Sequence, residues 1–279
     1  MEFLTLPFMQ QALAVSLLLA VLLGYFGWHV VLRRIVFVDL ALAQISALGI
    51  AFAILLDQSL TLFALAFTLV AAGILSLITE GRRVPSEAKM GIVYAVASAA
   101  SIVVISRTPH GEADVLKVMF GDILATPVAE VWRIAVIFII IGIVHAVLVR
   151  PMIRLTETIA EHGKPHDNRA RVWNLVFYLT LALAIAFAIR SGGVLLVFSY
   201  LIIAPVTGMV VSPRPLVVLL VAWVCGALAS VGGMGLSYHF DLSPGPTIVV
   251  CLGALLLVVT GAAWLAQRGK APAAVGLTR

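Results

Sequence analysis

Two polar side chains, Asp39 and Gln44, lie in one long apolar segment and are the first candidates for chemistry in this chain. Asp39 follows Arg34 by five residues, which is about 7 Å along a helix that rises 1.5 Å per residue. His29 precedes Arg33 by four residues and has a similar depth in the preceding segment. A pair between His29 and Asp39, or contact of both with a divalent metal ion, is therefore allowed geometrically. The alternative is that both side chains snorkel to a membrane interface.

Gln44 falls near the middle of the same segment, where an amide among apolar residues needs a partner. In a membrane, such an amide either hydrogen-bonds to a neighbouring helix or lines a wet cavity. Polar groups inside a membrane are candidates for function, because a charged group costs about 2.5–3.5 kcal/mol there. Both roles stay open for Gln44. His145, five residues before Arg150, is expected to be a structural residue near the end of its segment.

The elements that carry these side chains are nine apolar stretches of about 20 residues, the length that crosses about 30 Å of hydrocarbon. With 62% apolar residues, 11% charged residues and a mean hydropathy of +1.15, the chain has little room for a soluble domain. We therefore predict an all-α integral membrane protein in which residues 1–279 form one transmembrane domain with a short tail at 267–279. The expected spans are about 9–32, 36–56, 60–79, 90–106, 127–149, 171–189, 193–211, 215–237 and 246–266.

Positive charge falls on alternate loops. All Lys and Arg residues except Arg107, Lys117, Arg133 and Arg190 lie on one set of loops. The positive-inside rule then places the N-terminus outside and the C-terminus in the cytoplasm, as an odd number of spans requires. The pI of 9.6 is thus a topology signal, and no basic stripe with interleaved aromatic residues indicates a nucleic-acid partner. The first segment follows MEFLTLP, which has no Lys or Arg, and we interpret it as a retained span.

Two loops have enough residues for structure of their own. The cytoplasmic loop 150–170 is the longest polar segment, and Thr156–His162 is expected to form a short amphipathic helix that ends at Gly163 and Pro165. This loop either docks a soluble partner or is a solvated connector. On the outside, Val115–Leu124 is apolar enough to form a short helix on the surface.

ATP hydrolysis is not expected on this chain. Neither Gly163-Lys164 nor Gly269-Lys270 is followed by Ser or Thr, as a phosphate-binding loop requires. If ATP drives this protein, the hydrolysing subunit is another polypeptide. No cofactor is expected.

Four segments resemble motifs of one transporter family. VVLRRIVFVDLALAQISALG (30–49) is similar to its first-hairpin motif, and FGDILATP (120–127) is similar to its external FGNIL-type segment. GGVLLVFSYLIIAPVTG (192–208) resembles its GVLLV…LP span, and LSYHFDLSPGPTIVV (236–250) resembles its LSYYLDLPPGPTIVL pattern. The family comprises the permease subunits of ABC transporters that import zinc, manganese or iron, and the resemblance covers about 9–266.

The resemblance implies a type II ABC importer permease in a bacterial cytoplasmic membrane. Its implied partners are cytoplasmic ABC ATPase subunits, an extracytoplasmic metal-binding protein, a second permease copy and membrane lipid. The loop 150–170 would couple to the ATPase through Arg154, Glu157, Glu161 and His162. Phe120, Gly121 and Asp122 would lie on the receptor side, and the path would be lined by Asp39, Leu40, Gln44, Ser199 and Pro205.

The chain departs from the family at the residues that contact the metal. The family pattern GDALSHAxxPG carries an Asp and a His four residues apart, and an ungapped alignment puts Leu40 and Gln44 at these positions. Leu48 replaces the proline of the pattern, and the acid of this chain, Asp39, comes one residue early. Gln44 still offers a carbonyl oxygen, and Asp39 is a tentative second metal ligand.

Three further functions are alternatives for this chain. A chelated metal or another small solute would need fewer bare metal ligands and would tolerate Leu40. An ion-coupled secondary transporter would need carboxylates near the middle of the membrane and often shows two related halves, and we find neither. An intramembrane enzyme would need a nucleophile with a base or a metal cluster, and no HExxH or GxSxG motif is present.

Overall fold

The computed structural model of the chain describes residues 5–78, 84–106, 121, 123–165 and 167–268. These residues form α-helices joined by short turns and contain no strand, as the apolar pattern predicts. The helices are α1 (Pro7–Leu32), α2 (Val38–Leu55), α3 (Leu60–Ile78), α4 (Ser86–Ile105), α6 (Val128–Val147), α7 (Val149–His162), α8 (Asn168–Val211), α9 (Pro215–Phe240) and α10 (Pro244–Arg268).

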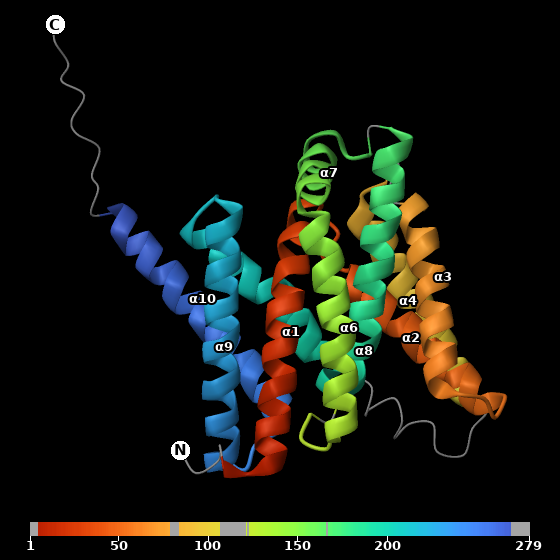
Figure 1. Ribbon diagram of the computed structural model, residues 1–279, viewed down its shortest axis with the longest axis horizontal. Coiled ribbons are helices and arrows are strands. Elements are labelled where there is room, and N and C mark those ends of the chain that lie inside the picture. The colour runs from red at the N-terminus through yellow and green to blue at the C-terminus, as the bar shows by residue number, and fades with distance from the viewer. Residues whose placement is uncertain (1–4, 79–83, 107–120, 122, 166, 269–279) are drawn as a thin grey trace, which may run out of the picture.

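Helix α8 contains two of the predicted spans. Its 44 residues would extend about 66 Å if straight, about twice the thickness of the hydrocarbon layer. The backbone breaks at Gly193, whose φ of 72° and ψ of 166° are not helical. In Figure 1 the chain descends before this point and returns upward behind α1 after it. The eight described helices that are long and apolar enough to cross a membrane therefore supply about nine crossings, which confirms the predicted fold class.

The centre of the bundle is formed by α1 and α8, which bury most of their apolar side chains, whereas α10 lies at the edge. Pro205 in α8 has no N–H and leaves the carbonyl of Leu201 without its helical partner. Gly27 of α1 packs against this carbonyl and lies so close to Pro205 that a Cβ on it would lie 2.5 Å from the ring Cγ. The glycine and the proline thus permit the close approach of α1 and α8.

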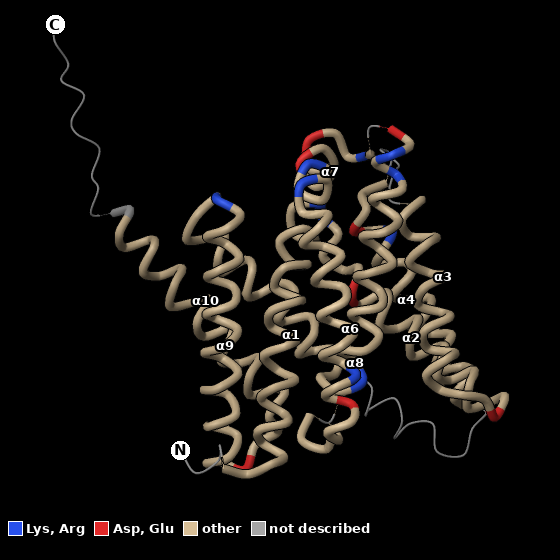
Figure 2. The backbone as a smooth tube through the Cα atoms, viewed as in Figure 1, with Lys and Arg blue, Asp and Glu red and all other residues tan. Residues whose placement is uncertain are grey.

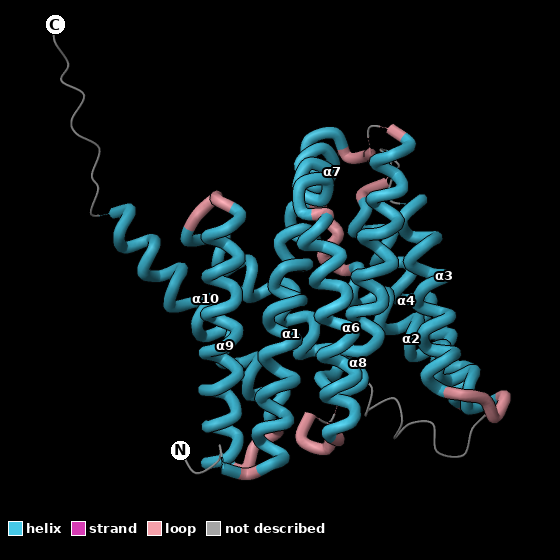
Figure 3. The backbone as a smooth tube through the Cα atoms, in the orientation of Figure 1, coloured by secondary structure: helices cyan, strands magenta, loops and turns pink. Residues whose placement is uncertain are grey.

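The two ends of the bundle differ in charge. Figure 2 shows most Lys and Arg positions at the end that carries α7, and Figure 1 shows the start of α1 and the end of α10 at opposite ends. Figure 3 shows most loops toward these two ends, but the turn between α1 and α2 descends into the bundle. Helix α2 therefore begins deeper than α1 ends.

The helix expected in the loop 150–170 is longer than predicted. It begins at Val149, seven residues before Thr156, because Pro151 lies in the first turn, where a missing N–H is tolerated. It ends as predicted at Gly163, which has a φ of 73° and donates its N–H to the carbonyl of Ile159. Of the predicted outer helix 115–124, residues 115–120 and 122 lie outside the described residues, and Ile123 and Leu124 lie in a turn.

Candidate functional site

Gln44 lies mid-helix in α2 with its side chain half-buried. Its amide has no hydrogen-bond partner in the part of the chain that the structure describes. Leu40 and Leu48 lie one turn before and after it on the same face of the helix, and both are also half-buried. The opposite side of α2, with Leu42 and Ser46, packs into the bundle. The face that carries Gln44 is thus a partly open stripe with one polar group.

Asp39 lies in the first turn of α2 and is only 1% exposed. Neither of its carboxylate oxygens has a hydrogen-bond partner among the described residues, although the start of a helix favours a negative charge. Asp39 and Gln44 are five residues apart, so they point about 140° apart around the helix. The structure does not bring the two onto one face. Within the described ranges, no group of three or more His, Cys, Asp and Glu residues is arranged to hold a metal ion.

The other two candidates for the path lie in the second part of α8. Ser199 is buried and donates its hydroxyl to the carbonyl of Leu195 in its own helix, at 2.8 Å. Pro205 is buried against Gly27. Their observed contacts are packing contacts inside the bundle.

His29 contacts a residue that the sequence did not single out as its partner. Its ring is fully buried, and its Nδ1 lies 2.6 Å from Oγ1 of Thr156 in α7. The described residues contain no ion pair between His29 and Asp39. Arg33 donates from Nε to the same Thr156 oxygen, at 3.0 Å. One hydroxyl of α7 is therefore held by two side chains from the end of α1.

Arg33 extends this network to two more helices. Its Nη1 donates to Oδ1 of Asn174 in α8 at 3.3 Å, and its Cζ lies 3.7 Å from the ring centre of Phe177. Asn174 in turn donates to the carbonyl of Ser76 in α3, at 3.0 Å. Burial lowers the pKa of the Arg33 guanidinium to about 10, so the group stays charged at neutral pH. The network His29–Thr156–Arg33–Asn174 ties α7 to three helices of the bundle.

His145 behaves as the structural residue that its position predicts. It is buried, with Nδ1 3.1 Å from the Tyr25 hydroxyl and Nε2 2.8 Å from Oγ1 of Thr180. Both ring nitrogens are therefore partnered, and the ring joins α6 to α1 and α8.

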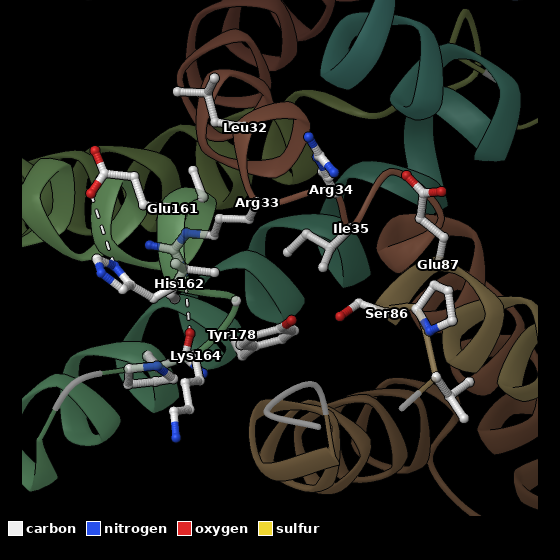
Figure 4. A pocket seen from close by; sticks show the side chains of 17 residues that line it. Leu32, Arg33, Arg34, Ile35, Ser86, Glu87, Glu161, His162, Lys164 and Tyr178 are labelled. Carbon is white, nitrogen blue, oxygen red and sulfur yellow. Dashed lines mark hydrogen bonds and ion pairs between the residues drawn. The ribbon is translucent and has the colours of Figure 1, made fainter. Parts of the chain in front are cut away.

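A cavity of about 460 Å³ opens where α7 ends, between the α1–α2 turn and the start of α4. Figure 4 shows Tyr178 and Ser86 with their hydroxyl groups toward this space and Arg34 above it. Glu161 and His162, two of the predicted coupling residues, line its wall. The other two lie further back along α7, where Arg154 lines a second cavity and Glu157 is exposed. Three of the four predicted coupling residues thus border cavities at the basic end of the bundle.

At the opposite end, Gly121 packs against the break in α8. Its φ is +64°, and a Cβ on it would lie 2.6 Å from the carbonyl carbon of Gly192 and would also overlap the nitrogen of Gly193. Two of the motifs singled out in the sequence, FGDIL and GGVLLV, therefore meet backbone to backbone. Phe120 and Asp122 lie outside the described residues.

Comparisons with known proteins agree with this architecture. Residues 5–263 match the family model described as the ABC 3 transport family. The manganese transport system membrane protein MntC of Halalkalibacterium halodurans is 23% identical over 91% of this chain and 87% of its own length. The manganese import system permease protein ScaB of Streptococcus parasanguinis is also 23% identical, over 90% of this chain and 89% of its own.

Solved structures share the fold. PsaBC from Streptococcus pneumoniae, in complex with Fab, matches with a TM-score of 0.76 and 22% identity over 92% of this chain and 94% of that chain. An inward-facing ABC transporter described as of metal-chelate type matches with a TM-score of 0.68 and 15% identity, over 91% of this chain and 85% of that chain. Because the family model covers nearly the whole chain and the bundle has the matching fold, this protein belongs to the ABC 3 transport family.

Proposed function

We propose that this chain is the membrane-spanning permease subunit of an ATP-driven importer for a divalent metal ion, with manganese as the first candidate. The named relatives MntC and ScaB are manganese transport proteins, and they match over most of their own length. Zinc and iron are the other ions that the sequence motifs suggest. The observation that carries the proposal is Gln44, a half-buried amide in the middle of a span with no partner among the described residues.

The proposed path runs along the face of α2 that carries Leu40 and Gln44. The amide oxygen of Gln44 would be a neutral ligand for a passing ion, and Asp39 would supply a negative charge deeper in the bundle. Oxygen ligands suit manganese better than zinc, which favours nitrogen and sulfur. A path with few fixed ligands binds its ion weakly and so releases it readily.

Alternating access would be driven from the α7 end. Separate ATPase subunits would dock on α7 and the loop 150–170 and move this helix when they close on ATP. Because Thr156 is bonded to both His29 and Arg33, a shift of α7 would pull directly on the end of α1. In this proposal α7 is cytoplasmic, the N-terminus is outside, and an extracytoplasmic metal-binding protein docks near Gly121. A second copy of the chain would complete the path.

A metal chelate is the second candidate cargo. It is favoured by the absence of a cluster of ligating side chains in the described part of the chain. A chelated ion already has its ligands and would pass a stripe such as Leu40–Gln44–Leu48 through contacts with the chelator.

Metal content of cells tests whether the cargo contains a metal ion. Cells that express this chain with its ATPase and binding protein are compared with cells that carry a hydrolysis-deficient ATPase. We expect an ATP-dependent rise in manganese. A flat profile for every metal, with an assembled complex that hydrolyses ATP, would refute the metal proposal.

The role of Gln44 is tested by Gln44→Leu. We expect uptake to be lost while membrane insertion and assembly are unchanged. Gln58→Leu is the matched control, because Gln58 is exposed in the turn after α2 and should tolerate the same change. Unaltered uptake in Gln44→Leu would reduce Gln44 to a packing residue.

A further inference from the structure

A mainly apolar cavity of about 350 Å³ lies between the last turns of α1 and the first turns of α7 and α9. Trp28 and His29 line it from α1, Ile153 from α7 and Leu219 from α9. It is separate from the stripe on α2 and from the cavity at the end of α7. Its volume is enough for a segment of hydrocarbon chain, and its walls suit one.

Three basic residues are next in the chain to residues that line this cavity, and two of them, Arg150 and Arg154, also line the second cavity beside α7. Arg150 and Arg154 each follow a lining residue of α7, and Arg214 precedes the first lining residue of α9. All three side chains are exposed, and none has an ion pair among the described residues. Arg150 and Arg154 are one helical turn apart and so lie side by side. An apolar pocket with an unpaired basic rim matches an acyl chain below an anionic headgroup.

One wall of the cavity carries a buried donor without an acceptor. Arg33 can only donate, so the Thr156 oxygen accepts from it and gives its own hydrogen to Nδ1 of His29. In the neutral imidazole the single N–H is then on Nε2. In the positively charged imidazolium both ring nitrogens carry a hydrogen, so Nε2 is a donor in either form. Nε2 is buried and has no hydrogen-bond partner among the described residues. A buried N–H without an acceptor is costly, so an acceptor oxygen from a ligand would stabilise this wall.

We propose that this cavity binds an anionic phospholipid from the leaflet on the α7 side. An acyl chain fills the space beside Leu219 and Ile153, and the wall shifts so that a glycerol ester carbonyl accepts from the buried Nε2 of His29. The phosphate lies among Arg150, Arg154 and Arg214. Trp28 is at the depth where aromatic side chains meet the headgroup region, one turn before the charged end of α1. A second copy of the chain fits less well, because an apolar face against this cavity would leave three arginines unpaired.

The test measures which lipid the purified full-length chain retains. The chain is extracted in detergent and given phosphatidylglycerol and phosphatidylcholine with identical acyl chains, and bound lipid is counted by native mass spectrometry. We expect phosphatidylglycerol to be retained several-fold over phosphatidylcholine. Replacement of Arg150, Arg154 or Arg214 by Gln should weaken phosphatidylglycerol retention about fivefold each, the equivalent of about 1 kcal/mol per basic residue. Arg190→Gln, at the other end of the bundle, is the matched charge control.

Leu219→Trp tests the cavity itself. It fills the space and should abolish retention, whereas Val136→Trp, on an exposed face of α6, should leave retention unchanged. If Leu219→Trp does not fold, photolabelling of the unmodified chain tests the proposal in its place. A photoreactive phosphatidylglycerol should then label α1, α7 and α9. Equal retention of the two lipids, or labelling confined to other helices, would overturn the proposal. A dimer that loses its second copy on Leu219→Trp, with no lipid bound in either form, would assign the cavity to the partner copy instead.

Discussion

Thr156→Val should break the tie between α7 and the end of α1. The Thr156 side chain is fully buried, and its single oxygen holds both Arg33 Nε and His29 Nδ1. Valine has nearly the same shape, so the change removes the hydroxyl with little loss of packing. The expected effect is therefore electrostatic, not steric.

The cost follows from the two bonds that are lost. A hydrogen bond to a charged group contributes about 1.5–3 kcal/mol, and one between neutral groups contributes about 1 kcal/mol. Arg33 keeps its bond to Asn174 and its contact with Phe177, so the full penalty of a stranded buried charge does not apply. We expect a loss of about 2–4 kcal/mol in the free energy of unfolding.

Denaturant unfolding of the purified chain measures this loss. Thr156→Ser is the control, because it keeps the hydroxyl and removes one methyl group, and it should lose about 1 kcal/mol or less. Under the proposed function, Thr156→Val should also lower the amount of metal transported per ATP hydrolysed, because α7 no longer pulls on α1. A Thr156→Val chain within about 0.5 kcal/mol of the unmodified one would refute the reasoning, since Arg33 and His29 would then have no need of this oxygen.

Two glycine substitutions test the close backbone approaches. Gly27→Ala should reduce the thermal stability of the folded chain strongly, because the new Cβ would overlap the carbonyl of Leu201, and overpacking against backbone costs about 1–3 kcal/mol or more. Gly121→Ala should lower stability as well, because a positive φ costs a non-glycine residue about 1–2 kcal/mol and the Cβ would overlap Gly193. Gly73→Ala, which meets open space inside a helix, should be neutral or stabilising in the same melting assay, and an equal loss for all three would contradict both arguments.

Much of the architecture follows from local properties of the chain. The length of each apolar stretch sets where a helix can cross the membrane, and the distribution of Lys and Arg distinguishes the two ends. Both features depend only on residues that are close together in the sequence, so they can be predicted without knowledge of the fold. The same holds for the end of α7 at Gly163, because a glycine there relieves the left-handed backbone that stops a helix.

The partners of the polar side chains depend on the packing of the helices. His29 and Thr156 are 127 residues apart, whereas the sequence only allowed a pair between His29 and Asp39, which are close together along the chain. Nearly every span is apolar throughout, so no pattern in the sequence tells which helices will be adjacent. The signal that was available for Asn174 was its place as an amide inside a span, the same signal that singled out Gln44.

The contrast between Gln44 and Asp39 has the same origin. Apolar length and charge determined from the sequence alone that this chain is a bundle of about nine spans with one basic end. Only the packing of α2 against its neighbours decided that the Gln44 side chain is half-buried while the Asp39 side chain is fully buried. A side chain inside a membrane is exposed to a path or buried according to which helix covers it, and that is a property of the whole bundle.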